Sequence, residues 1–261
     1  MSQPDTNGAL SEDGLREALA GARRVAFFGG SFDPPHLGHL AVARAAREAF
    51  RLDLVLFAPV GAQPLKPEGS TASFADRLAM TKLAIEGEPG FEVSLADAPK
   101  SSDTGAGAPN YRPNYTIDTL HRLRATLPSD CALYCLMGAD SFFGLRHWHR
   151  AAELPFAASF IVAGRPGQSL DELAVDLPHG LSLVPTPDGG FNKSAVEVRA
   201  FDVVNVARVR APFYLMPGLH VEISASEIRN SIRGAERGAK ETISALPEAV
   251  AEYIRVHGLY R

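Results

Sequence analysis

Short apolar runs alternate along most of the chain with segments whose apolar residues recur at helical spacing. The runs predict buried strands over residues 24–28, 54–59, 91–95, 133–137, 160–163, 181–184 and 213–216. The segments between them predict helices over residues 39–50, 74–85, 116–127, 141–154, 224–232 and 247–257. No element is predicted over residues 188–210.

This alternation favours an α/β fold with a doubly wound, mostly parallel sheet and a helical C-terminal portion. Ligands of such sheets bind beyond the carboxyl ends of the strands. The first strand is predicted to end at Gly29, so we expect ligand-binding residues directly after it.

Composition and charge narrow the class of protein. The chain has 261 residues, of which 46% are hydrophobic and 21% charged, and this is typical of a globular protein. We expect a flexible N-terminal tail over residues 1–22 and a single domain over residues 23–261. The net charge of −4 gives no general affinity for a nucleic-acid polymer or an anionic membrane. A phosphate ligand therefore needs a local site.

Targeting and redox signals are weak. No apolar stretch reaches the length of about 18 residues that a membrane helix needs, and the first residues lack the layout of a secretory signal. We therefore expect a cytoplasmic protein. Cys131 and Cys135 form neither a CxxC pair nor a disulfide framework, and their apolar surroundings predict small buried thiols.

The segment VAFFGGSFDPPHLGHLAVARAA, residues 25–46, combines a predicted strand, two glycines, an Asp-Pro-Pro corner and two histidines. Gly29 and Gly30 allow the backbone to approach a ligand closely, and the corner leads into a helix whose N-terminus favours an anion. His36 and His39 lie on one face of the first turn, where they can donate hydrogen bonds to phosphate oxygens. No GxGxxG follows the strand, so the segment predicts a phosphate site and not a nicotinamide-dinucleotide fingerprint.

Two other interpretations of the histidines stay open. The pair could bind a metal ion, although no Asp, Glu or Cys lies at a local spacing that would complete such a site. A single histidine at a helix end is often structural. The complete string GGSFDPPHLGH, and neither histidine alone, carries the prediction.

The string GGSFDPPHLGH, residues 29–39, resembles the GxFDPxHxGH signature of the class I nucleotidyltransferase superfamily. A second signature of that superfamily, usually ISSTxIR, has a counterpart in ISASEIR, residues 223–229, where Ala225 replaces a serine. The resemblance implies that the triphosphate is held by Ser224, Ser226 and Arg229. Taken alone, ISASEIR would be interpreted as a helix N-cap followed by a solvated arginine.

Further segments resemble bacterial nicotinate-nucleotide adenylyltransferase, and the resemblance extends from Arg23 to Arg261. These segments are NYTIDTLHRL (114–123), MGADSFFGLRHW (137–148), AGRPG (163–167) and LPEAVAEYIRVHGLY (246–260). The resemblance is weakest over residues 171–216, which are longer than the family pattern and are a possible insertion. In QPLK, residues 63–66, Leu65 replaces the histidine of the usual PPHK or PPHR, while Lys66 keeps the positive charge.

The resemblance implies direct adenylyl transfer in NAD biosynthesis. The 5′-phosphate of nicotinate mononucleotide would attack the α-phosphorus of ATP, giving nicotinate adenine dinucleotide and pyrophosphate. The motifs agree with this chemistry, because they contain donors and cations around phosphate but no nucleophile with an adjacent base. Mg²⁺ would be carried with ATP and keep several waters, so no protein ligand is assigned to it. The catalytic residues would be His36, His39, Arg229 and Lys66.

The same resemblance assigns separate residues to the two substrates. ATP would be bound by Gly29, Gly30, Ser31, Phe32, His36, His39, Gly138, Asp140, Arg165, Ser224, Ser226 and Arg229. Nicotinate mononucleotide would be bound by Lys66, Tyr115, Thr116, Trp148 and His149. The expected partners are these two nucleotides, with no nucleic-acid polymer and no membrane, and the sequence makes no prediction of the oligomeric state.

Some ATP-site residues have specific expected roles. By similarity, Asp140 meets the ribose, Arg165 lies near the adenine or the phosphates, and backbone donors come from Ser31 and Phe32. An Asp in this position could instead be a helix N-cap. Arg77 is interpreted either as a support of the site or as a solvated charge.

Two aromatic residues are expected at the site for nicotinate mononucleotide. By similarity, Trp148 is the platform for the pyridine ring, and backbone amides near Thr116 and His149 hold the nicotinate carboxylate. Tyr115 and Trp148 could instead be ordinary core or rim aromatics. A metal role for His149 is not favoured.

Two rival functions stay open. Phosphopantetheine adenylyltransferase would share the first signature but would not account for YTIDTL, the Trp148 segment or the ending HGLY. A non-catalytic nucleotide-binding or regulatory module would show no turnover. The intact His36, His39 and Arg229 argue against that module.

Overall fold

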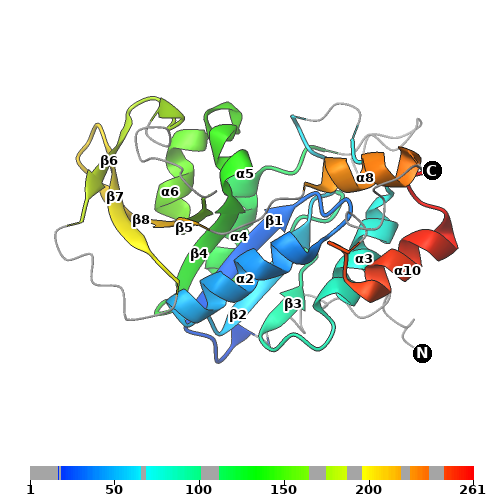
Figure 1. Ribbon diagram of the computed structural model, residues 1–261. Coiled ribbons are helices and arrows are strands. Elements are labelled where there is room, and N and C mark those ends of the chain that lie inside the picture. Colours follow the sequence, from blue (N-terminus) through cyan, green and yellow to red (C-terminus); the bar gives the residue numbers. More distant parts are fainter. Residues whose placement is uncertain are drawn as a thin grey trace.

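The computed structural model describes residues 17, 19–65, 69–100, 112–164, 175–186, 196–218, 224–234 and 244–261. Its strands are β1 (Arg24–Gly30), β2 (Leu54–Pro59), β3 (Phe91–Val93), β4 (Ala132–Gly138), β5 (Ser159–Ala163), β6 (Leu181–Pro185), β7 (Arg199–Asn205) and β8 (Arg210–Met216). They form one eight-stranded sheet in the order β3-β2-β1-β4-β5-β8-β7-β6 (Figure 1).

The strands from β3 to β8 in this order run parallel to one another. β1 lies between β2 and β4, with Val25 opposite Leu54 on one side and Leu133 on the other. Every residue of β2 is buried, as expected for a parallel strand that is covered on both faces. β7 runs antiparallel to β8 and to β6. The prediction of a mostly parallel sheet is therefore confirmed.

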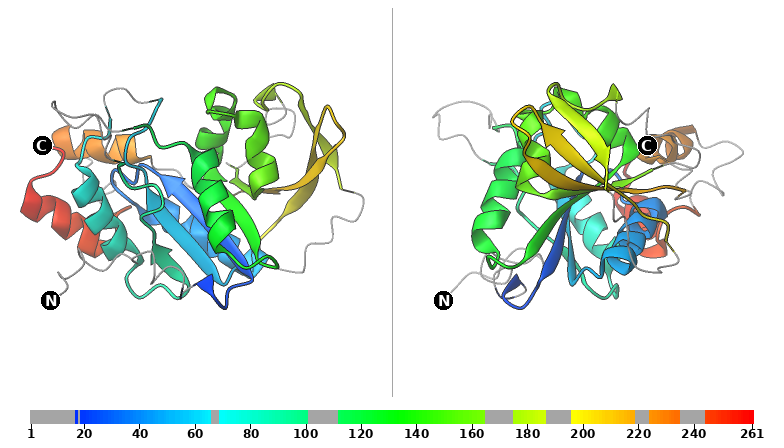
Figure 2. Two further views of the ribbon diagram at one scale, coloured as in Figure 1. Left: turned by 180° about the vertical axis from the view of Figure 1, so that it is seen from behind. Right: turned by 90° about the vertical axis from the view of Figure 1, so that its left-hand side faces the viewer.

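Helices cover both faces of this sheet, so the doubly wound arrangement is also confirmed. The α-helices are α2 (Leu37–Phe50), α3 (Phe74–Ile85), α4 (Thr116–Thr126), α5 (Ala139–Phe143), α6 (Leu154–Ala157), α8 (Ala225–Gly234) and α10 (Glu248–His257), and the short 3-10 helices are η1 (Leu145–His147) and η2 (Ala151–Glu153). α2 crosses one face and α4 the other (Figures 1 and 2). Phe28 packs in the core beneath α2, whereas Phe27 packs in the core beneath α4, because successive strand residues point to opposite faces.

Most predicted elements are present near their predicted ends. β2 and α3 have the predicted bounds, and β1 ends at Gly30, one residue beyond the predicted end. The single helix predicted over residues 141–154 is wrong. The chain there is divided among α5, η1, η2 and α6, with breaks at Gly144 and at Arg150, which has a left-handed φ of 53°.

β7 was not predicted, because it lies within the stretch 188–210, where the apolar pattern is weak. Three of its residues are buried, and the others are half-buried or exposed. Its neighbour β8 pairs with β5 and so extends the parallel part of the sheet. The origin of residues 171–216 as an insertion stays a prediction.

The predicted N-terminal tail is too long by a few residues. Leu19 and Ala22 are buried in the core beneath α4, so a flexible tail that includes these two residues is wrong. Residues 1–16 and 18 lie outside the described part of the chain.

The two cysteines are buried free thiols, as predicted. Burial raises the pKa of Cys135 to about 12, so this thiol stays protonated. No helix in the described ranges is both long and apolar enough to cross a membrane.

Candidate active site

Residues 29–36, which we call the glycine loop, connect the end of β1 to the start of α2. A Cβ on Gly29 would lie 2.7 Å from Cζ of Phe27, and a Cβ on Gly30 would lie 3.2 Å from Cζ of Phe32. A side chain at Gly29 would therefore force the buried Phe27 ring to shift, and one at Gly30 would press on the Phe32 ring. Both glycines and Ser31 border a cavity, so the backbone at this end of β1 is open to close approach by a ligand.

His36 and His39 lie at the N-terminus of α2 with their ring centres 3.8 Å apart. The backbone N–H of His36 donates to Nδ1 of His39 over 3.2 Å, which assigns the ring proton of neutral His39 to Nε2. Burial lowers the pKa of His36 to about 4, and burial together with the His36 charge lowers the pKa of His39 well below 6.5. Both imidazoles are therefore neutral at neutral pH and can act as N–H donors rather than as cations.

Arg229 reaches the glycine loop from α8. Its Nη1 donates to the backbone oxygen of Asp33 over 2.6 Å, and its Nη2 donates to Oγ of Ser226 over 3.1 Å. The interpretation of Arg229 as a solvated arginine is therefore wrong. The N-cap interpretation holds for Ser224, because its Oγ accepts from the N–H of Glu227 over 3.2 Å and its own N–H donates to Oε2 of Glu227 over 2.6 Å.

Arg77 supports the glycine loop by hydrogen bonding and is not a solvated charge. It is 2% exposed and donates to three backbone oxygens, those of Ser31 (2.6 Å), Val60 (2.8 Å) and Ala72 (3.3 Å). Burial lowers its pKa, and the charge of Asp33 opposes that shift. The sequence signal for this role was its place on the buried face of α3, one turn before Thr81.

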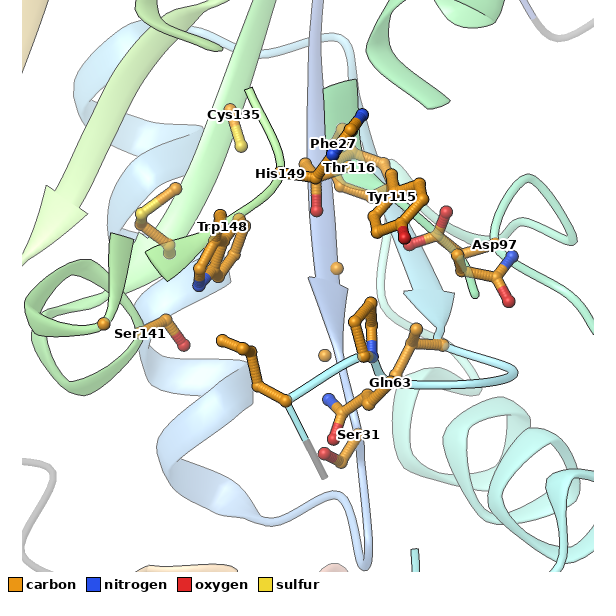
Figure 3. Close-up of a pocket in the computed structure, with 18 of the residues that line it drawn as sticks. Phe27, Ser31, Gln63, Asp97, Tyr115, Thr116, Cys135, Ser141, Trp148 and His149 are labelled. Atoms are coloured by element: carbon orange, nitrogen blue, oxygen red, sulfur yellow. The ribbon is translucent and has the colours of Figure 1, made fainter. Parts of the chain in front are cut away.

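A cavity of about 480 Å³, which we call the aromatic cavity, lies beside the glycine loop at the carboxyl ends of β1 and β4 (Figure 3). In Figure 3, Ser31 and Gln63 lie at one end of the cavity, and Tyr115 and His149 lie at the other. The cavity therefore shares Gly29, Gly30 and Ser31 with the glycine loop. His36, His39 and Arg229 are not among the described residues that line it.

The predicted acceptor residues come together in the wall of this cavity. Tyr115, Thr116, Trp148 and His149 all line it. Tyr115 stacks on His149 with ring centres 4.2 Å apart, which joins the start of α4 to the loop after η1. Trp148 is half-buried and packs against the core. Thr116 is the first residue of α4, so the positive end of a helix dipole faces the cavity.

Asp140 lines the cavity from the first turn of α5. The N-cap of α5 is Gly138, so the interpretation of Asp140 as an N-cap is wrong. Two predicted residues, Lys66 and Arg165, lie outside the described part of the chain. Leu65, which replaces the family histidine, lines the cavity and is 56% exposed.

Several polar residues of the cavity wall were not predicted as site residues, and Asp97 and Gln63 are two of them. Asp97 is 3% exposed, accepts a hydrogen bond from the Thr119 hydroxyl, and has its pKa raised by burial. Its position just beyond the carboxyl end of β3 is the signal that would have found it. Gln63 places a buried Oε1 in the wall without a hydrogen-bond partner among the described residues.

Residues 27–231 match the model of the cytidylyltransferase-like family, so the fold and the glycine loop define a nucleotidyltransferase. Two curated relatives, both named as probable nicotinate-nucleotide adenylyltransferases, are similar over nearly the whole chain. The relative from Gloeobacter violaceus is 34% identical over 91% of this chain and 96% of its own length. The relative from Stenotrophomonas maltophilia is 37% identical over 90% of this chain and 96% of its own length. The chain belongs to the nicotinate-nucleotide adenylyltransferase family.

Solved structures support the fold. A Plasmodium falciparum nicotinic acid mononucleotide adenylyltransferase complexed with NaAD superposes with a TM-score of 0.61 at 16% identity, covering 91% of this chain and 97% of that one. The same enzyme complexed with APC gives a TM-score of 0.59, again covering 91% of this chain and 97% of that one. These structures confirm the fold, and the family model and the curated relatives confirm the family resemblance drawn from the sequence motifs.

Proposed function

We propose that this chain transfers the adenylyl group of ATP to nicotinate mononucleotide and releases pyrophosphate and nicotinate adenine dinucleotide. The observation that carries the proposal is the contact between two sites: the glycine loop, suited to phosphates, forms one edge of the aromatic cavity, suited to a ring. Family membership supports the choice of both substrates.

The chemistry needs a single displacement at phosphorus. An oxygen of the acceptor 5′-phosphate forms a bond to the α-phosphorus as the bond from that phosphorus to the bridging oxygen breaks, and pyrophosphate leaves with the electron pair. Charge grows on the phosphate oxygens during this step. Neutral donors with fixed positions, such as Nε2–H of His39, stabilise that charge without reorganisation.

The phosphates of ATP would lie over the glycine loop and the N-terminus of α2. There the backbone N–H groups of Ser31 and Phe32, the imidazoles of His36 and His39, and the guanidinium of Arg229 would contact them. Asp140 would bind the ribose of ATP. Three further assignments stay predictions: Lys66 as a catalytic residue and ligand of the mononucleotide, Arg165 near the adenine or the phosphates, and Ser224 with Ser226 at the triphosphate.

The pyridine ring of the acceptor would stack on Trp148 in the aromatic cavity. Its ring carries a positive charge, which an indole face attracts. The N-terminus of α4 at Thr116 and the backbone near His149 would hold the carboxylate. Fixed N–H donors there favour a carboxylate over a carboxamide. Both carboxylate oxygens can accept from these donors, whereas the NH₂ group of a carboxamide would point its own N–H groups at them.

The chemistry of the family suggests a divalent metal, which we propose is Mg²⁺ bound to the triphosphate. Among the described residues, no group of three His, Cys, Asp or Glu side chains is placed to hold a metal ion. A cytoplasmic location and the absence of nucleic-acid and membrane partners also stay predictions.

Pyrophosphate release from ATP tests the proposal when three acceptors are supplied separately: nicotinate mononucleotide, nicotinamide mononucleotide and phosphopantetheine. We expect magnesium-dependent turnover that is fastest with nicotinate mononucleotide and that is absent without an acceptor. Equal or faster turnover of phosphopantetheine would contradict the assignment. ATP binding without turnover of any acceptor would instead favour the regulatory module.

A further inference from the structure

The chain after α10 folds back and brings Tyr260 into contact with the glycine loop. Gly258 and Tyr260 both have left-handed backbone angles, with φ of 62° and 65°. Such a conformation is strained for a tyrosine and persists only where the side chain is held firmly. Tyr260 is 5% exposed, and its hydroxyl donates to Oδ1 of Asp33 over 2.7 Å. Burial and this hydrogen bond raise the pKa of Tyr260, so the hydroxyl stays a donor.

Asp33 connects four segments that are distant in sequence. Its carboxylate, 3% exposed, accepts the Tyr260 hydroxyl, the N–H of Thr71 over 2.6 Å and the N–H of Ala72 over 3.1 Å. Its backbone oxygen accepts Nη1 of Arg229 over 2.6 Å. The position of Arg229 therefore depends on where Asp33 is held, and Tyr260 is the side-chain donor that holds it.

A displacement of Asp33 would act on the phosphate site in two ways. It would move the acceptor to which the Arg229 guanidinium is bonded, and it would move the loop that leads into His36, three residues later. Binding groups need to be held to within about 0.5 Å of their working geometry. A misplacement of about 1 Å far from the chemistry can lower the rate by roughly a hundredfold.

We propose that Tyr260 is a positioning residue for the triphosphate site, which acts through Asp33 to hold Arg229 in place. This inference rests on the proposed function, since it assigns Arg229 to the triphosphate. Tyr260 touches no substrate in this account. Its removal should change the binding of ATP and leave the binding of nicotinate mononucleotide unchanged.

Tyr253 provides a matched control for this contact. It lies on α10, its hydroxyl donates to Oδ1 of Asp76 on α3 over 3.1 Å, and α10 lies beside α3 (Figure 1). Tyr260→Phe and Tyr253→Phe each remove one hydroxyl that donates to one carboxylate. Only the first of these carboxylates belongs to the glycine loop.

The test measures the dissociation constant of a non-hydrolysable ATP analogue by calorimetry, together with the KM for each substrate and the thermal midpoint of both variants. Tyr260→Phe should weaken binding of the analogue by roughly tenfold, because a displaced Arg229 loses part of its charge-assisted hydrogen bonding to the triphosphate. The KM for nicotinate mononucleotide should not change. Tyr253→Phe should bind the analogue as the wild type does. Equal analogue binding by both variants, or an equal loss for both substrates, would overturn the proposal.

A double-mutant cycle with Arg229→Lys tests the route of the effect. Lysine cannot reproduce the paired N–H geometry of arginine, so Tyr260→Phe should have less than about a twofold further effect on analogue binding in that background. An undiminished effect would show that Tyr260 does not act through Arg229. If Tyr260→Phe does not fold, Asp33→Ala removes the acceptor of the same contact. The same selective loss of analogue affinity is expected, and wild-type affinity would overturn the proposal.

Calorimetry also keeps this inference separate from the proposed function. Analogue binding needs no acceptor, so a wild-type protein that binds the analogue but does not use nicotinate mononucleotide defeats the proposed function alone. If the wild-type protein turns over nicotinate mononucleotide and Tyr260→Phe binds the analogue as the wild type does, only the inference is contradicted.

Discussion

The glycine loop and the aromatic cavity adjoin each other but are built differently. In and around the glycine loop, Asp33, His36 and Arg77 are at most 5% exposed, and the loop accepts hydrogen bonds from the distant Arg77 and Arg229. In the cavity wall, Trp148 is half-buried and His149 is exposed, and both lie on a loop between short helices. Fixed groups suit the stabilisation of a transition state, and partly exposed aromatics suit the binding of a ring. Loss of a fixed donor to developing charge in the first region should therefore lower kcat, and loss of a ring platform in the second should raise a KM.

The largest expected effect comes from His39→Ala. Loss of one fixed donor to developing charge lowers kcat by roughly a hundred- to thousandfold, with little change in the KM for ATP. Steady-state kinetics with His121→Ala, which removes an exposed histidine of α4, provides the control. If only the KM for ATP increased, His39 would be a binder and the catalytic role would be wrong.

Arg77→Met should destabilise the protein by removing the hydrogen bonds that support the glycine loop. It leaves the backbone oxygens of Ser31, Val60 and Ala72 without their donor and should lower the free energy of unfolding by about 3 kcal/mol. Urea denaturation would measure this change. Arg44→Met is the comparison, because Arg44 pairs with Glu88 at the surface and such pairs contribute less than about 1 kcal/mol. Similar losses in both variants would contradict the scaffold role.

The buried histidines should make stability depend on pH. An unfolded histidine titrates near 6.5, whereas burial lowers the pKa of His36 to about 4 in the folded chain. Between these values the unfolded chain binds more protons, so the free energy of unfolding falls as the pH is lowered from about 6.5 toward 4, by roughly 2 to 3 kcal/mol from His36. Denaturation of His36→Gln across the same range should show a smaller fall. An equal fall in both proteins would mean that His36 is not buried in its neutral form.

The smallest expected effect, about 1 to 2 kcal/mol, comes from Trp148→Ala. The KM for the mononucleotide should rise roughly five- to thirtyfold, while the KM for ATP and the ratio of nicotinate to nicotinamide use stay unchanged. Trp148 is the single tryptophan of the chain, so its fluorescence reports the stacking directly. Nicotinate mononucleotide should quench it and ATP should not. Unchanged fluorescence and kinetics would make Trp148 a structural aromatic.

The contrast between the two regions also explains which features the sequence could predict. Strand ends, the glycine loop and the histidine pair depend on local spacing, and those elements were found within a few residues. The contacts that fix the site join residues far apart, such as Arg229 to Asp33 across 196 positions and Tyr260 to Asp33 across 227. No local pattern contains such contacts.

Predictions made from residue type and local spacing were wrong where tertiary contacts decide the local structure. Arg77 was open to interpretation as a solvated charge because isolated arginines usually are, yet backbone oxygens converge on it. The helix over residues 141–154 was predicted from the spacing of its apolar residues, but Gly144 and the left-handed Arg150 interrupt it. That interruption places Trp148 and His149 in the cavity wall.

The central claim is that one site joins the α-phosphate of ATP directly to the mononucleotide held beside it. Incubation with nicotinate mononucleotide and ATP labelled either at the α-phosphate or at the γ-phosphate tests it. We predict that the α-label appears only in the dinucleotide, that the γ-label appears only in pyrophosphate in equal amount, and that the protein itself carries no label after denaturation. An α-label trapped on the protein, or a dinucleotide without label, would contradict direct transfer between the two adjoining regions.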